Sequence, residues 1–245
     1  SQFALQQQIL NRTRTLGLIG QLPGFQGNVP IELKALLKDT NITKQGKTGW
    51  MDSLDPNFGK VADVWMSELT KAFGTDHWYQ LDGYFNGGTA PWLDGSDNST
   101  VVNTVTDDPL WKRRGTNAYM GLNRTDPHAI WSFQGFAFEF WKHTSSRLNA
   151  LKGFIDSAPK DKFVIIDMDY NEGEWLKWNS FFDAPFVWSK LHEFGGTDGM
   201  KGNMTRASEL PSRALHSKTN IVGTGFTSEG IDQNPAYYDL ILDSH

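Results

Sequence analysis

Six short apolar runs, most of them separated by helical stretches, are the feature that most constrains how this 245-residue chain can fold. The clearest run, 163–168, is rich in β-branched residues, which is typical of a strand buried on both faces. Because strands that alternate with helices usually pair in parallel, the pattern predicts an α/β fold with a parallel sheet. The predicted strands are 16–23, 77–85, 129–135, 163–168, 185–191 and 220–225.

Helical periodicity is strongest at 58–73, where Val61, Val64, Trp65 and Leu69 recur on one face and Gly74 follows as a stop signal. A proline at the start of 30–38 predicts a short helix there. The remaining predicted helices are 5–16, 110–122 and 144–155.

Composition excludes several classes of function. The formal net charge is -5, which gives no electrostatic footprint for nucleic acid. No apolar run approaches the roughly 18 residues of a membrane span. Cysteine is absent, so thiolate metal sites and cysteine nucleophiles are excluded. No histidine pair with helical metal-ligand spacing, nucleotide-binding glycine motif or serine-nucleophile motif occurs, and we therefore expect no metal and no cofactor.

Polar and glycine-rich turns follow several of the predicted strands, which favours a site at the carboxyl ends of a parallel sheet. Both a doubly wound sheet and a (β/α)8 barrel place their chemistry there. The last strand ends in Gly223-Thr224-Gly225, and Glu229 follows it closely. The ordinary alternative for Glu229 is a surface carboxylate that opens a helix. The carboxylates, amides and aromatics at these ends suit a neutral polyhydroxylated ligand, and glycoside hydrolysis needs two carboxyl groups.

Five Asn-x-Ser/Thr sequons indicate a glycoprotein of the secretory pathway, either secreted or lysosomal. Each sequon by itself is weak, because the pattern arises by chance. The acceptor residues are Asn11, Asn41, Asn98, Asn123 and Asn203.

Several blocks in fixed order carry a resemblance to a known family. They are 22–30 (LPGFQGNVP), 73–77 (FGTDH), 191–196 (LHEFGG), 222–225 (VGTG) and 229–234 (EGIDQN). Together they resemble the α-N-acetylglucosaminidases, glycoside hydrolase family 89, along nearly the whole chain. The resemblance implies a (β/α)8 barrel and a retaining hydrolase that removes terminal α-linked N-acetylglucosamine from glycans, in animals from heparan sulfate in lysosomes.

The same resemblance implies roles for individual residues. Glu229 matches the family's nucleophile. Met168, Leu191 and Phe194 fall where the family lines its sugar pocket. Phe136 stands where the family usually has a pocket tryptophan, so an aromatic ring is kept but is smaller.

The proton donor departs from the family pattern, which has a glutamate at the end of the fourth strand. Without a gap, Asn86 takes the acid/base position and Phe85 replaces a pocket asparagine; we prefer this alignment because Tyr84 then matches an aromatic. With one inserted residue, Asn86 is the pocket asparagine and Gly87 takes the donor position. A carboxamide cannot protonate a leaving group, and we consider Asp169 a candidate relocated acid.

The resemblance also predicts that residues 1–245 are a partial barrel that supplies the third to eighth strands. The first two strands and a helical C-terminal region would lie outside this chain. Because an open barrel exposes two sheet edges, we expect a second polypeptide to complete it. Two alternatives stay open: a catalytically inactive glycan-binding or structural subunit, and an unrelated doubly wound α/β protein.

Overall fold

A parallel sheet of six strands forms the centre of the protein. The computed structural model describes residues 1–81, 108–135, 145–169, 173–193, 196, 202–217 and 219–243. Neighbouring strands of this sheet all pair in parallel, in the order β1-β5-β6-β7-β8-β9. All six strands predicted from the sequence are confirmed. Their bounds are β1 (Gln21–Pro23), β5 (Trp78–Gln80), β6 (Ile130–Gln134), β7 (Phe163–Asp169), β8 (Phe186–His192) and β9 (Ile221–Ser228).

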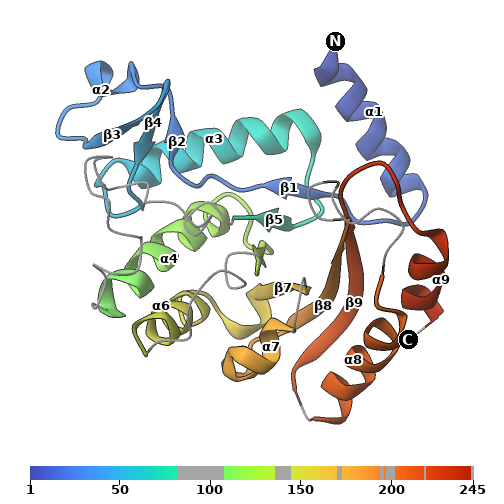
Figure 1. The fold of residues 1–245 in the computed structure, drawn as a ribbon. Helices are drawn as coiled ribbons and strands as arrows, with labels where there is room; N and C mark the ends of the chain where they lie inside the picture. Colours follow the sequence, from blue (N-terminus) through green and yellow to red (C-terminus); the bar gives the residue numbers. More distant parts are fainter. Residues whose placement is uncertain are drawn as a thin grey trace.

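Helices lie around the outside of the curved sheet (Figure 1). The bounds predicted for α3 are those observed, and Gly74 ends it with a φ of 71°. The sequence analysis missed α8 and α9; α8 contains Pro211 in its interior, a position that normally disfavours a helix. The helices are α1 (Gln2–Thr15), α2 (Leu33–Leu36), α3 (Phe58–Phe73), α4 (Asp108–Asn123), α6 (Ser145–Ile155), α7 (Glu174–Lys177), α8 (Met204–His216) and α9 (Pro235–Asp243).

The outer, helix-covered face of the sheet carries an aromatic core. Trp131 packs edge-on against Phe154 of α6 and Phe163 of β7, with ring centroids 6.0 and 5.0 Å apart. These rings are buried, as are Phe133 and Trp188 on the same face. Large aromatic rings bury much area each, so this layer is the main source of hydrophobic stabilisation.

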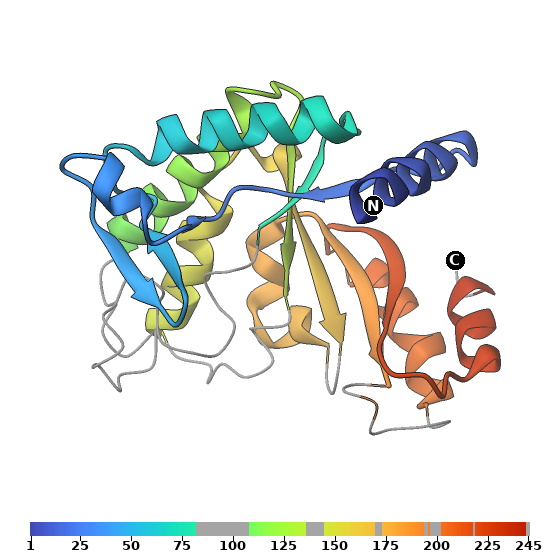
Figure 2. The ribbon, with the colours of Figure 1, turned by 90° about the horizontal axis from the view of Figure 1, so that it is seen from above.

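The inner face of the sheet is more open. Residues that alternate with the core aromatics, such as Gln80, Gln134, Ile166 and Val187, are only half-buried. Figure 2 shows β6, β7 and β8 side by side, with their carboxyl ends at one side of the molecule. The inner face and the carboxyl ends are therefore the part of the sheet that can receive a ligand.

A second sheet, which the sequence analysis missed, lies between β1 and α3 in the chain. It is antiparallel in the order β2-β4-β3, with β2 at Asn28–Val29, β3 at Ile42–Gln45 and β4 at Thr48–Met51. These strands have two to four residues, too few for a clear alternation of polar and apolar side chains. Of the helix predicted at 30–38, only α2 forms.

Within the residues that the structure describes, no helix combines the length and apolar character needed to cross a bilayer.

Candidate active site

Glu229 lies directly after β9, half-buried, in a loop that is tied to its neighbours by backbone hydrogen bonds. The Glu229 N–H donates to the carbonyl oxygen of His192 at 3.0 Å. The side-chain amide of Gln233 donates to the carbonyl oxygen of Glu229. The residue is therefore held both to the end of β8 and to the segment that leads into α9.

The alternation of β8 and β9 places this loop at the inner face of the sheet. His192 stacks on Tyr237 of α9, with ring centroids 4.8 Å apart, so His192 faces outward. Leu191 must then face inward, because successive residues of a strand point to opposite faces. Leu191 pairs with Thr227, and Glu229 comes two residues after Thr227. Thr227 therefore faces inward as well, and Glu229 lies one residue past the end of β9.

Met168 belongs to the same row of inward residues. It pairs with Ser189 of β8, and Ser189 pairs in turn with Gly225 of β9. Met168 is 5% exposed and Leu191 1% exposed. The structure thus brings Met168, Leu191 and Glu229 to the carboxyl ends of three neighbouring strands, as the sequence analysis requires for a common site. Their contact with a sugar stays a prediction.

The other candidate residues cannot be placed in the same way. Phe85, Asn86, Phe136 and Phe194 lie outside the described residues. Asp169 ends β7, where its backbone pairs with Lys190, and its side chain is outside the description. The identity of the second carboxyl group is therefore still a prediction.

Two buried carboxylates near the end of β7 have a structural role. Asp167 is fully buried and accepts a hydrogen bond from the backbone N–H of Trp175 at 3.3 Å. Glu174 accepts from the Nε1–H of Trp178 at 2.6 Å and lies 3.4 Å from the Nζ of Lys177. These contacts fix α7 against the outer face, away from the Glu229 loop.

Glu193 is a buried carboxylate beside the Glu229 loop to which the sequence analysis gave no role. It is 1% exposed and has a φ of 57°, which is unusual for a residue other than glycine. Glu193 stands in the 191–196 block, but no sequence pattern indicates that a glutamate directly after a predicted strand is buried. Only the packing against the neighbouring loop singles it out.

A hydrogen-bonded cluster at the amino ends of β5 and β6 also escaped the sequence analysis. Asp126, buried, accepts from the Thr75 hydroxyl at 3.0 Å and the Tyr79 hydroxyl at 2.8 Å, and its Oδ2 lies 2.8 Å from Nδ1 of His77. Oδ1 accepts from the backbone N–H of His128 at 3.1 Å. We call these five residues the Asp126 cluster. The 73–77 block that carries part of the family resemblance supplies two of its members.

The cluster sets the ionisation of its own groups. Burial alone raises the pKa of Asp126, but the hydrogen bonds from His77, Tyr79, His128 and Thr75 outweigh it and hold that pKa below its ordinary value. Burial raises the pKa of Tyr79, and the adjacent Asp126 charge adds to this effect. Asp126 is thus ionised and satisfied at the end of the sheet opposite Glu229.

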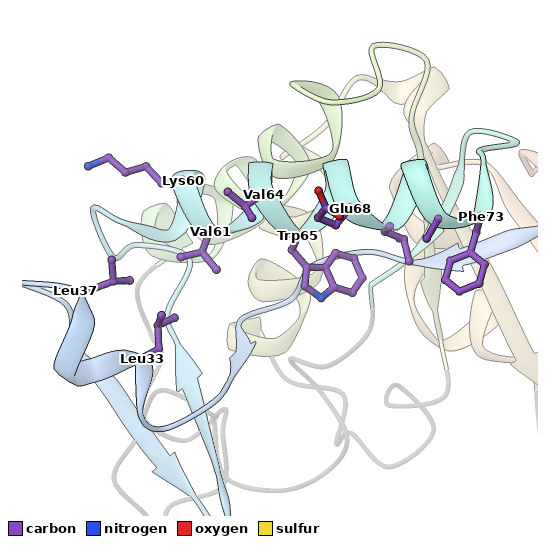
Figure 3. Close-up of a pocket in the computed structure, with 10 residues that line it drawn as sticks. Leu33, Leu37, Lys60, Val61, Val64, Trp65, Glu68 and Phe73 are labelled. Carbon is purple, nitrogen blue, oxygen red and sulfur yellow. The ribbon is translucent and has the colours of Figure 1, made fainter. Parts of the chain in front are cut away.

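An apolar groove of about 630 Å³ runs along α3 (Figure 3), and none of its lining residues belongs to the six-stranded sheet. Its lining includes the charged residues Lys60 and Glu68, and Figure 3 shows Lys60 extending outward. A sugar needs several convergent polar groups, so this groove is a poor candidate for a glycan. The apolar lining consists of Leu33, Leu37, Val61, Val64, Trp65, Leu69, Ala72 and Phe73.

Among the described residues, no group of three or more His, Cys, Asp or Glu side chains could hold a metal ion.

Three of the four acceptor asparagines that the structure describes are exposed. Asn11 and Asn41 are exposed. Asn203 is exposed at the start of α8, where its Oδ1 accepts from the Arg206 N–H at 2.9 Å. Asn123 is half-buried, and Asn98 lies outside the described residues. Glycosylation at any of them stays a prediction.

Known proteins with the same arrangement were found both by sequence and by structure. The chain is 28% identical to human alpha-N-acetylglucosaminidase over 260 aligned positions, which cover 99% of the chain and 32% of the human protein. A family 89 glycoside hydrolase from Clostridium perfringens, solved in complex with PUGNAc, superposes with a TM-score of 0.73 at 23% identity over 97% of the chain. A variant of the Clostridium perfringens enzyme, solved with its substrate GlcNAc-α-1,4-galactose, superposes with a TM-score of 0.72 at 23% identity over 96% of the chain.

The chain spans about a third of the length of the human relative and a quarter of each bacterial chain. The family profile of the alpha-N-acetylglucosaminidase (NAGLU) TIM-barrel domain matches residues 1–245. The parallel strands and outer helices of the chain agree with that match, and the six-stranded sheet is part of a TIM barrel. The chain belongs to the alpha-N-acetylglucosaminidase TIM-barrel family.

Proposed function

We propose that this chain forms part of a retaining glycosidase site for terminal α-linked N-acetylglucosamine, with Glu229 as the nucleophile. The observation that carries the proposal is the position of Glu229 after β9, with Leu191 and Met168 inward on the two neighbouring strands. In barrel enzymes, the carboxyl ends of the strands hold the chemistry. The described inner face is neutral apart from Glu229 and suits an uncharged sugar ring.

In this mechanism, a carboxylate oxygen of Glu229 attacks the anomeric carbon while the bond to the leaving oxygen breaks. A covalent glycosyl-enzyme forms, and water then releases the sugar with retained configuration. Retaining enzymes place a second carboxyl group roughly 5–5.5 Å from the nucleophile to protonate the leaving group. The loss of such a general acid typically costs about 10²–10⁴-fold in rate.

Asn86 at the acid/base position makes the rate depend on the leaving group. Phenols with a low pKa need no protonation when they depart, so activated aryl glycosides are turned over while alkyl glycosides are slow. If Asp169 is the relocated acid, Asp169→Asn lowers turnover of the alkyl glycosides and leaves the activated aryl glycosides largely unaffected. Unchanged turnover of both substrates would remove Asp169 from the mechanism.

The test of the nucleophile uses an activated aryl α-N-acetylglucosaminide and the variants Glu229→Gln and Glu229→Ala. Both lose turnover, whereas the exposed carboxylate of α8 serves as a matched control in Glu209→Gln and keeps it. Added azide restores aryl release to Glu229→Ala, because azide fits the vacated space and attacks the anomeric carbon to give the β-glycosyl azide. Full activity of Glu229→Gln would overturn the proposal.

The amide at the acid/base position also favours a second candidate, an inactive glycan-binding subunit. Such a subunit binds N-acetylglucosamine when measured by calorimetry. It releases no aryl group from the activated aryl glycoside at any protein concentration. Activity that disappears in Glu229→Gln excludes it.

We also propose that further polypeptide completes the barrel and that the assembly is a glycoprotein of the lysosome or the secretory route. β1 and β9 form the two edges of the six-stranded sheet, and Val222 of β9 is 57% exposed. Unpaired sheet edges with apolar side chains can pair with a strand of another polypeptide. Recovery of this chain as a stable, soluble, isolated monomer would contradict completion by a second chain.

A further inference from the structure

The turn after β8 and the loop after β9 pack against each other with unusual closeness. Glu193 begins the turn in a left-handed conformation, and its carbonyl oxygen accepts a hydrogen bond from the Gly196 N–H at 2.9 Å. The Glu193 side chain is 1% exposed. A glutamate is seldom fully buried, so Glu193 stands out among the residues at this end of the sheet.

The Glu193 carboxylate restricts which residue can stand at position 230, directly after Glu229. A Cβ at Gly230 would lie 1.9 Å from the Oε2 of Glu193 and 2.9 Å from the Cα of Gly196. Gly230 also has a φ of 70°, a conformation that side chains disfavour. The carboxylate of Glu193 therefore occupies the volume that any side chain at position 230 would need.

Glu229 is thus held at both of its peptide bonds. Its own N–H donates to the carbonyl oxygen of His192 at 3.0 Å, which fixes the residue on the amino side. On the other side, Gly230 rests against the carboxylate of Glu193, the residue after His192. His192 and Glu193, which are consecutive in the chain, thereby hold the peptide units on the two sides of Glu229.

The side chain of Glu193 also lies near α9. Burial raises the pKa of the Tyr238 hydroxyl; a hydrogen bond with Ser228 opposes this, and the charge of Glu193 adds to it. Tyr238 in turn contacts the ring of Phe226 in β9, with centroids 4.6 Å apart. The carboxylate is therefore enclosed by β8, β9 and α9, which explains its lack of contact with solvent.

We propose that Glu193 is a positioning residue for the nucleophile: its buried side chain packs on Gly230 and fixes the direction in which Glu229 presents its carboxylate. The inference rests on the proposed function, since it assigns Glu193 a role in the same site. Glu193 acts by occupying volume and not by transferring a proton, because its carboxylate lies against Gly230 and faces Tyr238 of α9. A displacement of about 1 Å at a reacting group can cost about 10²-fold in rate.

The experiment is a double-mutant cycle with an activated aryl α-N-acetylglucosaminide as the probe. Glu193→Ala lowers kcat by about 10-fold and Gly230→Ala by about 10²-fold, with KM changed by less than about twofold, because the nucleophile is misdirected while the sugar contacts remain. In the double variant the two losses do not multiply, since removal of the Glu193 carboxylate relieves the 1.9 Å contact of the new methyl group and leaves only its 2.9 Å contact with the Cα of Gly196. Gly17→Ala is the matched control: its φ is 77° and nothing lies within 4 Å of the added Cβ, so kcat is unchanged.

The near-isosteric Glu193→Gln separates positioning from acid catalysis. It keeps the volume and retains most of kcat and the shape of the pH profile. Loss of activity equal to that of Glu193→Ala would show that the ionisable group itself is required and would overturn the inference, as would losses that multiply in the cycle.

Two further outcomes separate this inference from the proposed function. If Glu229→Gln keeps its turnover, the proposed function fails; if Glu229→Gln is inactive and Glu193→Ala and Gly230→Ala are fully active, only the inference fails.

Amide hydrogen exchange at Glu229 provides a readout that needs no turnover. Glu193→Ala speeds it by more than about 10-fold as the loop loosens, and an unchanged exchange rate would overturn the inference.

Discussion

Each end of the parallel sheet contains a buried carboxylate, and the surroundings of the two carboxylates differ. At the amino ends of β5 and β6, Asp126 is buried and receives hydrogen bonds from four neighbouring groups, including Thr75 and Tyr79. At the carboxyl ends of β8 and β9, the buried carboxylate of Glu193 packs against Gly230. Glu193, Gly196 and Gly230 all have positive φ values. Positive φ values occur at both ends, since His77 of the Asp126 cluster has a φ of 68°. The two ends differ instead in what surrounds the buried carboxylate: hydrogen-bond donors converge on Asp126, whereas the Glu193 carboxylate lies against Gly230.

The contrast indicates where stability and function are located. A fully hydrogen-bonded carboxylate such as that of Asp126 stabilises the folded state without offering a group to a ligand. In barrel enzymes, chemistry belongs to the carboxyl ends of the strands and the opposite end serves stability. Variants at the two ends should therefore affect different measurements.

Glu229→Gln should have the largest effect, and only on activity. We expect kcat/KM to fall by at least about 10³-fold, because no other group of the site replaces a covalent nucleophile. The free energy of unfolding should change by less than about 0.5 kcal/mol, since the substitution is nearly isosteric at a half-buried position. Kinetics and urea unfolding of the same preparation check both halves, and a large loss of stability would break the comparison.

Asp126→Asn should show the reverse pattern. The amide cannot accept from four donors as a carboxylate does and brings its own N–H groups into a site built from donors. We expect the free energy of unfolding to fall by about 2–4 kcal/mol, measured by urea titration, because buried donors lose their partner. At a temperature where the variant is folded, kcat should equal that of the unmodified chain. A specific loss of kcat would contradict the division of roles.

Tyr79→Phe tests a single hydrogen bond of the Asp126 cluster. Its hydroxyl donates to Asp126 at 2.8 Å, and we expect its removal to cost about 1 kcal/mol of stability. Tyr119→Phe is the matched control, because the Tyr119 hydroxyl makes only a 3.4 Å contact with Asn123. Thermal unfolding of both variants should separate them; equal losses would show that the cluster adds nothing beyond the burial of a ring.

The smallest effect is on the pH dependence of stability. The pKa of Asp126 is below its ordinary value of 3.8 in the folded chain, so its contribution is fully present above about pH 4 and is lost as pH falls through the lower folded pKa. Between pH 7 and pH 5 the Asp126 contribution should be flat. Below pH 4 the unmodified chain should lose stability more steeply than Asp126→Asn, by up to about 1.4 kcal/mol for each unit of pKa shift. Parallel curves in urea titrations at pH 3–7 would contradict the assignment.

Local sequence patterns were sufficient for the strands of the main sheet, whereas the role of Glu229 as a nucleophile came from the family resemblance and stays a prediction. A continuous β-branched run identifies β7 whatever surrounds it, and helical spacing closed by Gly74 fixes both ends of α3. The place of Glu229 follows from its distance along the chain after β9. The second sheet was not predictable in this way, because strands as short as β2 gain their stability from pairing and not from local propensity.

What the sequence determined by itself, then, is the six parallel strands in chain order, the helices α3, α4 and α6, the family, and the strand end at which Glu229 lies. These depend on residues that are neighbours in the chain. Only the tertiary structure decided that Asp126 meets Thr75, 51 residues earlier, and that Glu193 lies on Gly230. Such contacts join segments far apart in sequence, and their energy depends on burial and distances of a few ångströms. No local pattern of residues records either quantity, so the packing of Glu193 on Gly230 is visible only in the folded chain.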